Sequence, residues 1–372
     1  MSREDPTVCL TVSCIRPTPF MTSPSPYVAF ITSPLEYEYV ERIREAAPEG
    51  VEILYQPDLL PQTRYIADHK GRDGFARTPA QDRRWRDALA RATILWDFPS
   101  GPEGTRGLAL APQVKWVQTT SSGVGQAVAN MGLADSDVIV TTARGVHADA
   151  LAEFALFIML AHVKDLPRLQ RDQQAHRWER YCCGELSGKS LTIIGAGQVG
   201  ARVACLARAF NMRVNAVVNR PSPERRTELF ADEVYGQADL KSAVKDADYI
   251  VLATPHTPQT ERMIDGEIWA ATKRGVVFVN IARGQVVDEP AMIEALGSGH
   301  IGLAGLDVAA TEPLPPGSPL WSMPNVIISP HSASTAPSEN GKITDIFIRN
   351  LNHYVRGETD QMINVLDKAR MY

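Results

Sequence analysis

The stretch LTIIGAGQVG, residues 191–200, decides the fold of this chain. Residues 191–194, three of them apolar, predict a buried strand, the spacing G-x-G-x-x-G follows at once, and residues 201–210 have the composition of a helix. In that context Gly195 permits a tight turn, Gly197 lets the backbone approach a pyrophosphate, and Gly200 lets the helix pack closely on the strand. We therefore expect a dinucleotide-binding α/β domain, in preference to a glycine-rich turn in an unrelated protein.

Strand and helix patterns alternate on the carboxyl side of this motif, as in a doubly wound parallel sheet. Six candidate strands are predicted, the number in a dinucleotide fold built from two halves. They span residues 191–194, 213–218, 249–253, 276–280, 303–307 and 326–329. We expect the dinucleotide-binding domain to cover residues 147–330.

A second parallel sheet is predicted before the motif, from apolar runs at residues 27–32, 51–55, 92–96, 114–118 and 138–141. Residues 147–163 are apolar nearly all round, which is typical of a buried helix, here one that joins two domains. Residues 343–354 predict a returning helix. The expected architecture is two Rossmann-like domains, the dinucleotide domain being inserted into a discontinuous, flavodoxin-like substrate domain of residues 27–146 and 331–372. We expect an exposed loop at residues 59–78 and a disordered tail over residues 1–26.

The composition excludes some classes of function. A net charge of -5 and a pI near 5.9 give no bulk attraction to nucleic acid or to an anionic membrane. The longest apolar stretch, residues 151–161, is too short to span a bilayer. Five cysteines without metal-ligand spacing predict reduced thiols, a cytoplasmic location and no metal site.

The second strand of the dinucleotide domain bears on which cofactor binds. Gln198 and Val199 open the first helix, whose free N–H groups and positive dipole end would face the phosphates. After the next strand, an acid would accept hydrogen bonds from the ribose hydroxyls of NAD. Asn219 and Arg220 stand there instead, and a guanidinium can bind a 2′-phosphate. NADP(H) is therefore favoured over NAD(H).

Other roles remain open for the arginines near this strand. Arg220 is alternatively a solvated surface residue, or one that stacks on adenine without reading the phosphate. Arg225 and Arg226 either assist in binding the phosphate or only cap the next helix.

The later motifs resemble the D-isomer-specific 2-hydroxyacid dehydrogenase family. They are NIARGQVVDE (280–289), GLAGLDV (302–308), TEPLP (311–315), PLW (319–321) and PNVIISPH (324–331). The resemblance is dense from residue 145 to residue 331. It is looser over residues 27–145 and after residue 331, and none is visible over the first 26 residues.

This resemblance implies three catalytic residues for hydride transfer to a keto acid. Arg283 would grip the substrate carboxylate and polarise the keto oxygen, for which an always-charged planar group is suited. His331 would be the acid in reduction and the base in oxidation, and Glu312 would favour its protonated form. Each alone could be a surface ion-pair partner, a turn residue or a loop histidine, but their joint order and flanks favour the catalytic interpretation.

The resemblance also assigns binding residues. Residues 119–124 resemble the family's substrate loop, whose backbone N–H groups would hold the carboxylate opposite Arg283; these groups belong to Ser122, Gly123 and Val124. Most members continue with an aspartate where this chain has Gly125 and Gln126, which leaves a plain turn as the alternative. Trp96 or Phe98 is a candidate wall for the substrate. Further cofactor contacts are implied at Thr254, Ile281, Ala282 and Asp307, whereas His256 is expected to be a loop residue.

The expected activity is reduction of a small 2-keto acid such as glyoxylate or hydroxypyruvate to the D-hydroxy acid, by a homodimer formed through the cofactor domain. Two alternatives stay open: a non-enzymatic nucleotide sensor like the C-terminal-binding corepressors, and a phosphite dehydrogenase. Both have a similar set of catalytic residues. The family's formate dehydrogenases typically carry an amide in place of the glutamate, so Glu312 argues against that activity.

Overall fold

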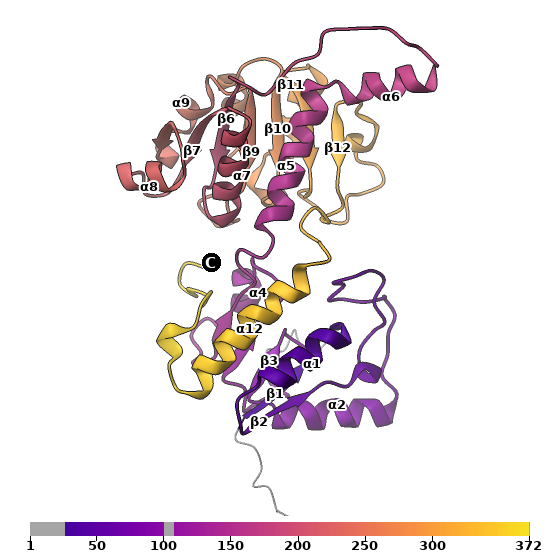
Figure 1. The fold of residues 1–372 in the computed structure, drawn as a ribbon, viewed down its shortest axis with the longest axis vertical. Helices are drawn as coiled ribbons and strands as arrows, with labels where there is room; N and C mark the ends of the chain where they lie inside the picture. Colours follow the sequence, from indigo (N-terminus) through magenta and orange to yellow (C-terminus); the bar gives the residue numbers. More distant parts are fainter. Residues whose placement is uncertain (1–26, 100–107, 372) are drawn as a thin grey trace, which may run out of the picture.

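Two parallel sheets organise the computed structural model, which describes residues 27–99 and 108–371 (Figure 1). The first sheet has the strand order β2-β1-β3-β4-β5, which is the flavodoxin-like order. Its strands are β1 (Tyr27–Ile31), β2 (Val51–Leu54), β3 (Ile94–Trp96), β4 (Trp116–Gln118) and β5 (Ile139–Thr141). All five predicted strands are present, each one or two residues shorter than expected.

Alternate residues of the first sheet face two layers of helices. One face packs on α1 (Tyr37–Ala46) and α12 (Glu339–Val355), and the other packs on α2 (Pro79–Arg91). Trp96 points into the first layer, where it is fully buried and meets the ring of Phe347 edge-on, with the centroids 5.4 Å apart. The expectation that Trp96 forms a substrate wall is therefore wrong. Phe98 is half-buried and packs against the opposite layer.

The second sheet has the strand order β12-β11-β10-β9-β6-β7-β8, so its first strand, β6 (Ser190–Ile194), lies between β9 and β7. This is the doubly wound order of a dinucleotide fold with one strand added at the end, and the predicted fold class is confirmed. The other strands are β7 (Arg213–Val217), β8 (Glu233–Tyr235), β9 (Tyr249–Leu252), β10 (Val276–Asn280), β11 (Ile301–Leu306) and β12 (Val326–Ile328). The prediction of six strands missed β8, a short edge strand that is only partly buried.

Helices cover both faces of the second sheet. On one face, α5 (Ala148–Val163) packs against α7 (Gln198–Ala209) and across β10 and β11. Gly305 of β11 makes this possible, because a Cβ there would collide with the side chain of Ile158 in α5. The remaining helices of this half are α6 (Leu166–Gln174), α8 (Pro223–Glu228), α9 (Leu240–Val244), α10 (Gly266–Ala271) and α11 (Glu289–Gly297).

The chain crosses between the two sheets twice, before α5 and again between β12 and α12 (Figure 1). The crossings are tied together by ion pairs. Asp149 in the first turn of α5 accepts from Lys342 of α12 at 3.1 Å and from Arg202 of α7 at 2.8 Å. The Asp149 carboxylate therefore joins the two helices that follow the crossings, α5 and α12, to α7 of the second sheet.

The loop expected to be exposed at residues 59–78 is exposed only in part. Ala67 and Asp68 are buried, because the Asp68 carboxylate accepts hydrogen bonds from the backbone and side chain of Arg64 and from the backbone N–H groups of Lys70 and Gly71. The guanidinium of Arg64 holds the pKa of this carboxyl well below its usual range. The polar sequence of this loop predicts that it is exposed. Its centre is buried instead, because the Asp68 carboxylate accepts hydrogen bonds from within the loop.

The C-terminal segment returns to the first sheet. Leu366 donates its backbone N–H to Val140 at 2.8 Å, and Thr142 donates to Asn364 at 3.0 Å. The backbone carbonyl of Met371 then packs on Gly125, where no Cβ would fit. Gly125 begins α4 (Gly125–Asn130), so the departure from the family's aspartate coincides with this close approach. Within the described ranges, no helix has the length and apolarity needed to cross a bilayer.

Candidate active site

The candidate site lies where the carboxyl ends of strands from both sheets meet. Gly123 follows β4 of the first sheet and Arg283 follows β10 of the second. The Arg283 guanidinium lies against Gly123 so closely that a Cβ at this glycine would collide with it. The predicted substrate loop therefore faces the predicted carboxylate-binding arginine at a residue without a side chain.

The local backbone fixes Arg283. The buried Asn280 side chain accepts from the Ala282 N–H at 3.0 Å and donates to the Arg283 carbonyl at 3.3 Å. The guanidinium donates back to the Ala282 carbonyl at 2.7 Å. Gly284 then packs directly on the backbone of Ala309, where a side chain would not fit. The arginine turn and the loop that carries Glu312 are therefore in direct contact.

His331 and Glu312 form a close pair. The His331 Nδ1 and the Glu312 Oε2 are 2.7 Å apart, and both side chains are more than a third exposed. The other Glu312 oxygen accepts from the backbone N–H of Ala309 at 3.2 Å. Since Nδ1 is occupied, Nε2 is the ring nitrogen of His331 that remains for a substrate. The two residues that the motif order predicted as partners are thus hydrogen-bonded.

Asp307 holds the turn that presents His331. It is 3% exposed, and its Oδ1 accepts from the Ser329 hydroxyl at 2.7 Å and from the Ala333 N–H at 2.9 Å. Its backbone carbonyl accepts from the His331 N–H at 2.8 Å, while its own N–H donates to Asn280 at 3.0 Å. The cofactor contact of Asp307 stays a prediction, whereas the structure shows that this residue anchors the His331 turn.

The glycine loop has the shape required to hold a pyrophosphate. Gly195 has a φ of +94°, and a Cβ there would lie 2.6 Å from the backbone of Thr254. A Cβ at Gly200 would collide with the Gly195 carbonyl, whereas the space above Gly197 is open. Gly197 also precedes α7 without any side-chain cap, which leaves the helix N-terminus available to an anion. Gln198 and Val199 form the first turn of α7, and the Gln198 side chain lies against Gly145.

The predicted cofactor-selecting residues lie at the end of β7. Asn219 and Arg220 are exposed, and among the described residues no hydrogen bond or ion pair engages the Arg220 guanidinium. Arg225 donates to the Ala196 carbonyl of the glycine loop at 2.8 Å. Arg226 instead faces Glu233 at 3.9 Å, away from that loop. Of the two arginines with open roles, only Arg225 bonds to the glycine loop.

Ile281 and Ala282 have buried side chains that belong to the cores beneath the sheet. Only their backbones are placed next to Arg283. His256 forms an ion pair with Glu261 on the surface, in agreement with its expected place in a loop. Among the described residues, no group of three or more histidine, cysteine or acidic side chains could hold a metal ion.

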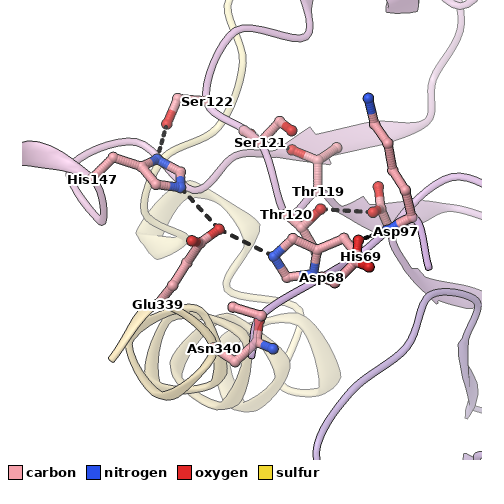
Figure 2. Close-up of polar contacts among 12 residues, drawn as sticks. Asp68, His69, Asp97, Thr119, Thr120, Ser121, Ser122, His147, Glu339 and Asn340 are labelled. Carbon is pink, nitrogen blue, oxygen red and sulfur yellow. Dashed lines mark hydrogen bonds and ion pairs between the residues drawn. The ribbon is translucent and has the colours of Figure 1, made fainter. Parts of the chain in front are cut away.

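A buried polar cluster behind the substrate loop was not predicted (Figure 2). Ser122 Oγ lies 3.3 Å from His147 Nδ1, and His147 Nε2 lies 3.1 Å from Glu339 Oε1. The same oxygen lies 3.1 Å from His69 Nε2. Burial raises the pKa of the Glu339 carboxyl, but the hydrogen bonds from His147 and His69 outweigh burial and lower it to about 2. The four residues of this cluster come from distant parts of the chain, so no local pattern signals it.

Comparisons with a family model, with curated proteins and with solved structures all indicate the same protein family. Residues 156–333 match the family model described as the NAD binding domain of D-isomer specific 2-hydroxyacid dehydrogenases. The D-3-phosphoglycerate dehydrogenase of Mycobacterium leprae is 35% identical over 283 residues, which are 71% of this chain and 51% of that protein. The glyoxylate reductase of Thermococcus kodakarensis is 33% identical over 230 residues, 59% of this chain and 68% of that one.

A solved structure gives a similar result over nearly the whole chain. A D-isomer specific 2-hydroxyacid dehydrogenase from Xanthobacter autotrophicus Py2, in complex with NADPH and MES, superposes with a TM-score of 0.71 and is 28% identical. The match covers 94% of this chain and 100% of the other. By contrast, the chain spans only about half the length of the phosphoglycerate dehydrogenases that it matches.

The buried carboxylate of Glu339 predicts a specific effect of pH on stability. A carboxyl whose folded pKa of about 2 lies below its ordinary value of 4.5 stabilises the fold above pH 4.5, and this contribution disappears as the pH falls towards 2. Relative to the Glu339→Gln variant, the wild type should lose about 3 kcal/mol of unfolding free energy between about pH 5 and pH 2. Urea unfolding at stepped pH measures the difference.

Glu358→Gln is the matched control, because Glu358 also pairs with a histidine, His353, but is more than a third exposed. The difference between wild type and this control should change less with pH. Parallel stability curves for the wild type and Glu339→Gln would contradict the assignment.

Proposed function

The chain belongs to the D-isomer specific 2-hydroxyacid dehydrogenase family, and we propose that it transfers a hydride from NADPH to a small 2-keto acid of the glyoxylate or hydroxypyruvate type, giving the D-2-hydroxy acid. The observation that carries this proposal is the 2.7 Å contact between His331 Nδ1 and Glu312. That contact leaves Nε2 as a proton donor on the same sheet edge as Arg283.

Arg283 and the substrate loop are proposed to bind the substrate from opposite sides. The guanidinium binds the carboxylate and polarises the keto oxygen, and the backbone N–H groups of Ser122, Gly123 and Val124 hold the carboxylate from the other sheet. The close approach of Arg283 to Gly123 supports this, because both groups can reach one small anion. A small substrate is favoured for the same reason.

His331 and Glu312 are proposed to manage the proton. Glu312 keeps Nδ1 protonated and stabilises the charged ring, so Nε2–H can donate to the oxygen as the carbonyl carbon becomes tetrahedral. In the reverse direction Nε2 accepts the hydroxyl proton. Asp307 holds the turn in which His331 has a φ of +54°, which keeps the ring in place.

A nicotinamide dinucleotide, when bound, supplies the hydride. The residues proposed to hold it are the three glycines of the loop, the first turn of α7 and Thr254, with Ile281, Ala282 and Asp307 lining the nicotinamide end. NADPH is proposed over NADH because Arg220 is uncommitted at the end of β7 and no carboxylate stands there. The Xanthobacter relative is in complex with NADPH, which supports this choice.

Turnover distinguishes the reductase from the two alternatives. Purified protein should oxidise NADPH with glyoxylate or hydroxypyruvate faster than with pyruvate, phenylpyruvate or phosphohydroxypyruvate. Arg283→Ala should lower kcat/KM at least about 10²-fold, since it removes a charged group that stabilises the developing oxyanion. Steady-state absorbance at 340 nm measures both results.

Arg274→Ala is the matched control, because Arg274 lies at the amino end of β10, whereas Arg283 follows its carboxyl end. It should leave turnover unchanged. Binding of NADPH without reduction of any keto acid would favour the nucleotide sensor, and NADP-dependent oxidation of phosphite would favour the phosphite dehydrogenase.

Cofactor selection gives a second test. Arg220→Ala should raise the KM for NADPH about 10- to 100-fold, the contribution of a charge-assisted hydrogen bond to the 2′-phosphate, and change the KM for NADH little. Arg226→Ala, which removes an arginine that faces Glu233, should change neither constant. An equal loss with both cofactors would show that Arg220 stacks on adenine without reading the phosphate.

We also propose that the protein is a homodimer. Figure 1 shows α6 and the following segment extending away from the second sheet, and Trp178 in that segment is 97% exposed. Phe157 of α5 and Leu169 of α6 are also about half exposed. Exposed apolar side chains of this size favour a partner surface, and a second copy is the simplest partner with the same surface.

The proposed location is a reducing, cytoplasmic compartment. Three cysteines support this location because they are free and exposed: Cys182, Cys183 and Cys205.

Trp178→Glu should convert the dimer to a monomer at micromolar concentration, because a charge would replace the apolar contact. Sedimentation velocity measures the change. Trp321→Glu alters another exposed tryptophan, 53% exposed near the end of the second sheet, and should leave the dimer intact. A wild type that sediments as a monomer would reject the homodimer.

A further inference from the structure

The cluster behind the substrate loop joins the two segments that cross between the sheets. His147 directly precedes α5, and Glu339 is the first residue of α12. Their side chains are only 14% and 7% exposed, so the 3.1 Å contact between them is shielded from water. The acid also stands at a helix N-terminus, where its negative charge is favoured.

The hydrogen-bond donors and acceptors fix the proton on His147. An ionised carboxylate can only accept, so the contacts from His147 Nε2 and His69 Nε2 to one Glu339 oxygen require a proton on each of these nitrogens. In a neutral His147 ring, Nδ1 is then an acceptor, and the Ser122 hydroxyl, 3.3 Å away, is its donor. Glu339 thereby determines the direction in which the Ser122 hydroxyl points.

We propose that His147 is a positioning residue for the reaction: it fixes the Ser122 hydroxyl and so holds the substrate loop against Arg283, with Glu339 setting the ring nitrogen that carries the proton. This inference rests on the proposed reductase function, in which that loop binds the substrate carboxylate.

The remaining anchors of the loop show why Ser122 needs a partner of its own. The Thr120 hydroxyl donates to Asp97 at 2.7 Å, the Thr119 hydroxyl donates to the Ser121 carbonyl at 2.8 Å, and Ala143 donates to that carbonyl at 3.2 Å. These bonds end at Ser121. Gly123, which meets Arg283, has no side chain to hold it. The Ser122–His147 bond is therefore the last side-chain anchor before the residue that faces the guanidinium (Figure 2).

Two substitutions of His147 test its two contacts separately, because glutamine places an amide near the position of Nε2 and asparagine places one near the position of Nδ1. In His147→Gln, the longer side chain places its amide at the position of Nε2, where it can still donate to Glu339, and leaves no acceptor at the position of Nδ1 that faces Ser122. In His147→Asn, the shorter side chain can accept from Ser122 but does not reach Glu339. We expect His147→Gln and Ser122→Ala each to raise the KM for glyoxylate about 3- to 10-fold, the contribution of one hydrogen bond, with kcat nearly unchanged.

The double variant distinguishes positioning from general loss of structure. Ser122→Ala combined with His147→Gln should raise the KM no more than either change alone, because both remove the same bond. His147→Asn should recover a KM closer to that of the wild type. His162→Gln makes the same substitution near the other end of α5, where the ring contacts Tyr249, and should leave the KM unchanged. Additive effects, or an unchanged KM in Ser122→Ala, would overturn the proposal.

A measurement that needs no turnover separates this inference from the proposed function. In protein labelled with [15N]histidine, the ring shifts of His147, assigned by their loss in His147→Gln, should show the proton on Nε2. A proton on Nδ1 would overturn the proposal even in an active enzyme. If the wild type reduces no keto acid, the reductase function fails, and binding of oxamate to the NADPH complex then tests the loop by the same set of variants. Should His147→Gln fail to fold, Ser122→Ala alone still decides the matter.

Discussion

The carboxyl ends of parallel strands lie at one edge of their sheet. The candidate site depends on the contact between this edge of the first sheet and the corresponding edge of the second. One edge supplies the substrate loop after β4, and the other supplies Arg283 after β10. Neither sheet has both groups. The guanidinium contacts Gly123, which has no side chain, so a backbone and one arginine bring the two edges together. Everything proposed about substrate size follows from that spacing.

Buried polar side chains organise the loops at these edges. Asn280 holds the arginine turn, Asp307 holds the turn of His331, and Asp68 closes the loop that carries His69. Each satisfies backbone N–H groups that a loop would otherwise bury without partners, which is the usual condition for placing irregular backbone inside a protein. The groups proposed to act on the substrate are more exposed, and their positions depend on this buried layer.

The sequence alone was sufficient for the five strands of the first sheet, for six strands of the second, for the glycine loop and for the pairing of Glu312 with His331, because each rests on a local pattern or on a fixed order of motifs. Contacts between remote residues were not predictable: His147 and Glu339 are 192 positions apart, and His69 and Glu339 are 270 apart. β8 was missed because a three-residue edge strand has little apolar periodicity. Trp96 was misassigned because a large aromatic residue at a strand end suits a pocket or a core equally well, and only α12, far along the chain, makes this face a core.

The two crossings are joined by ties of different physical character. The outer one, Asp149 with Lys342 and Arg202, consists of side chains that are 40% to 50% exposed, and such charges are screened by dissolved ions over about 8 Å at physiological ionic strength. The inner one, His147 with Glu339, is shielded from those ions. Added salt would therefore weaken the exposed ion pairs of Asp149, while the shielded contact between His147 and Glu339 keeps its strength. Rising ionic strength would thus weaken the surface ion pairs between the crossings before it affects the loop that the inner pair supports.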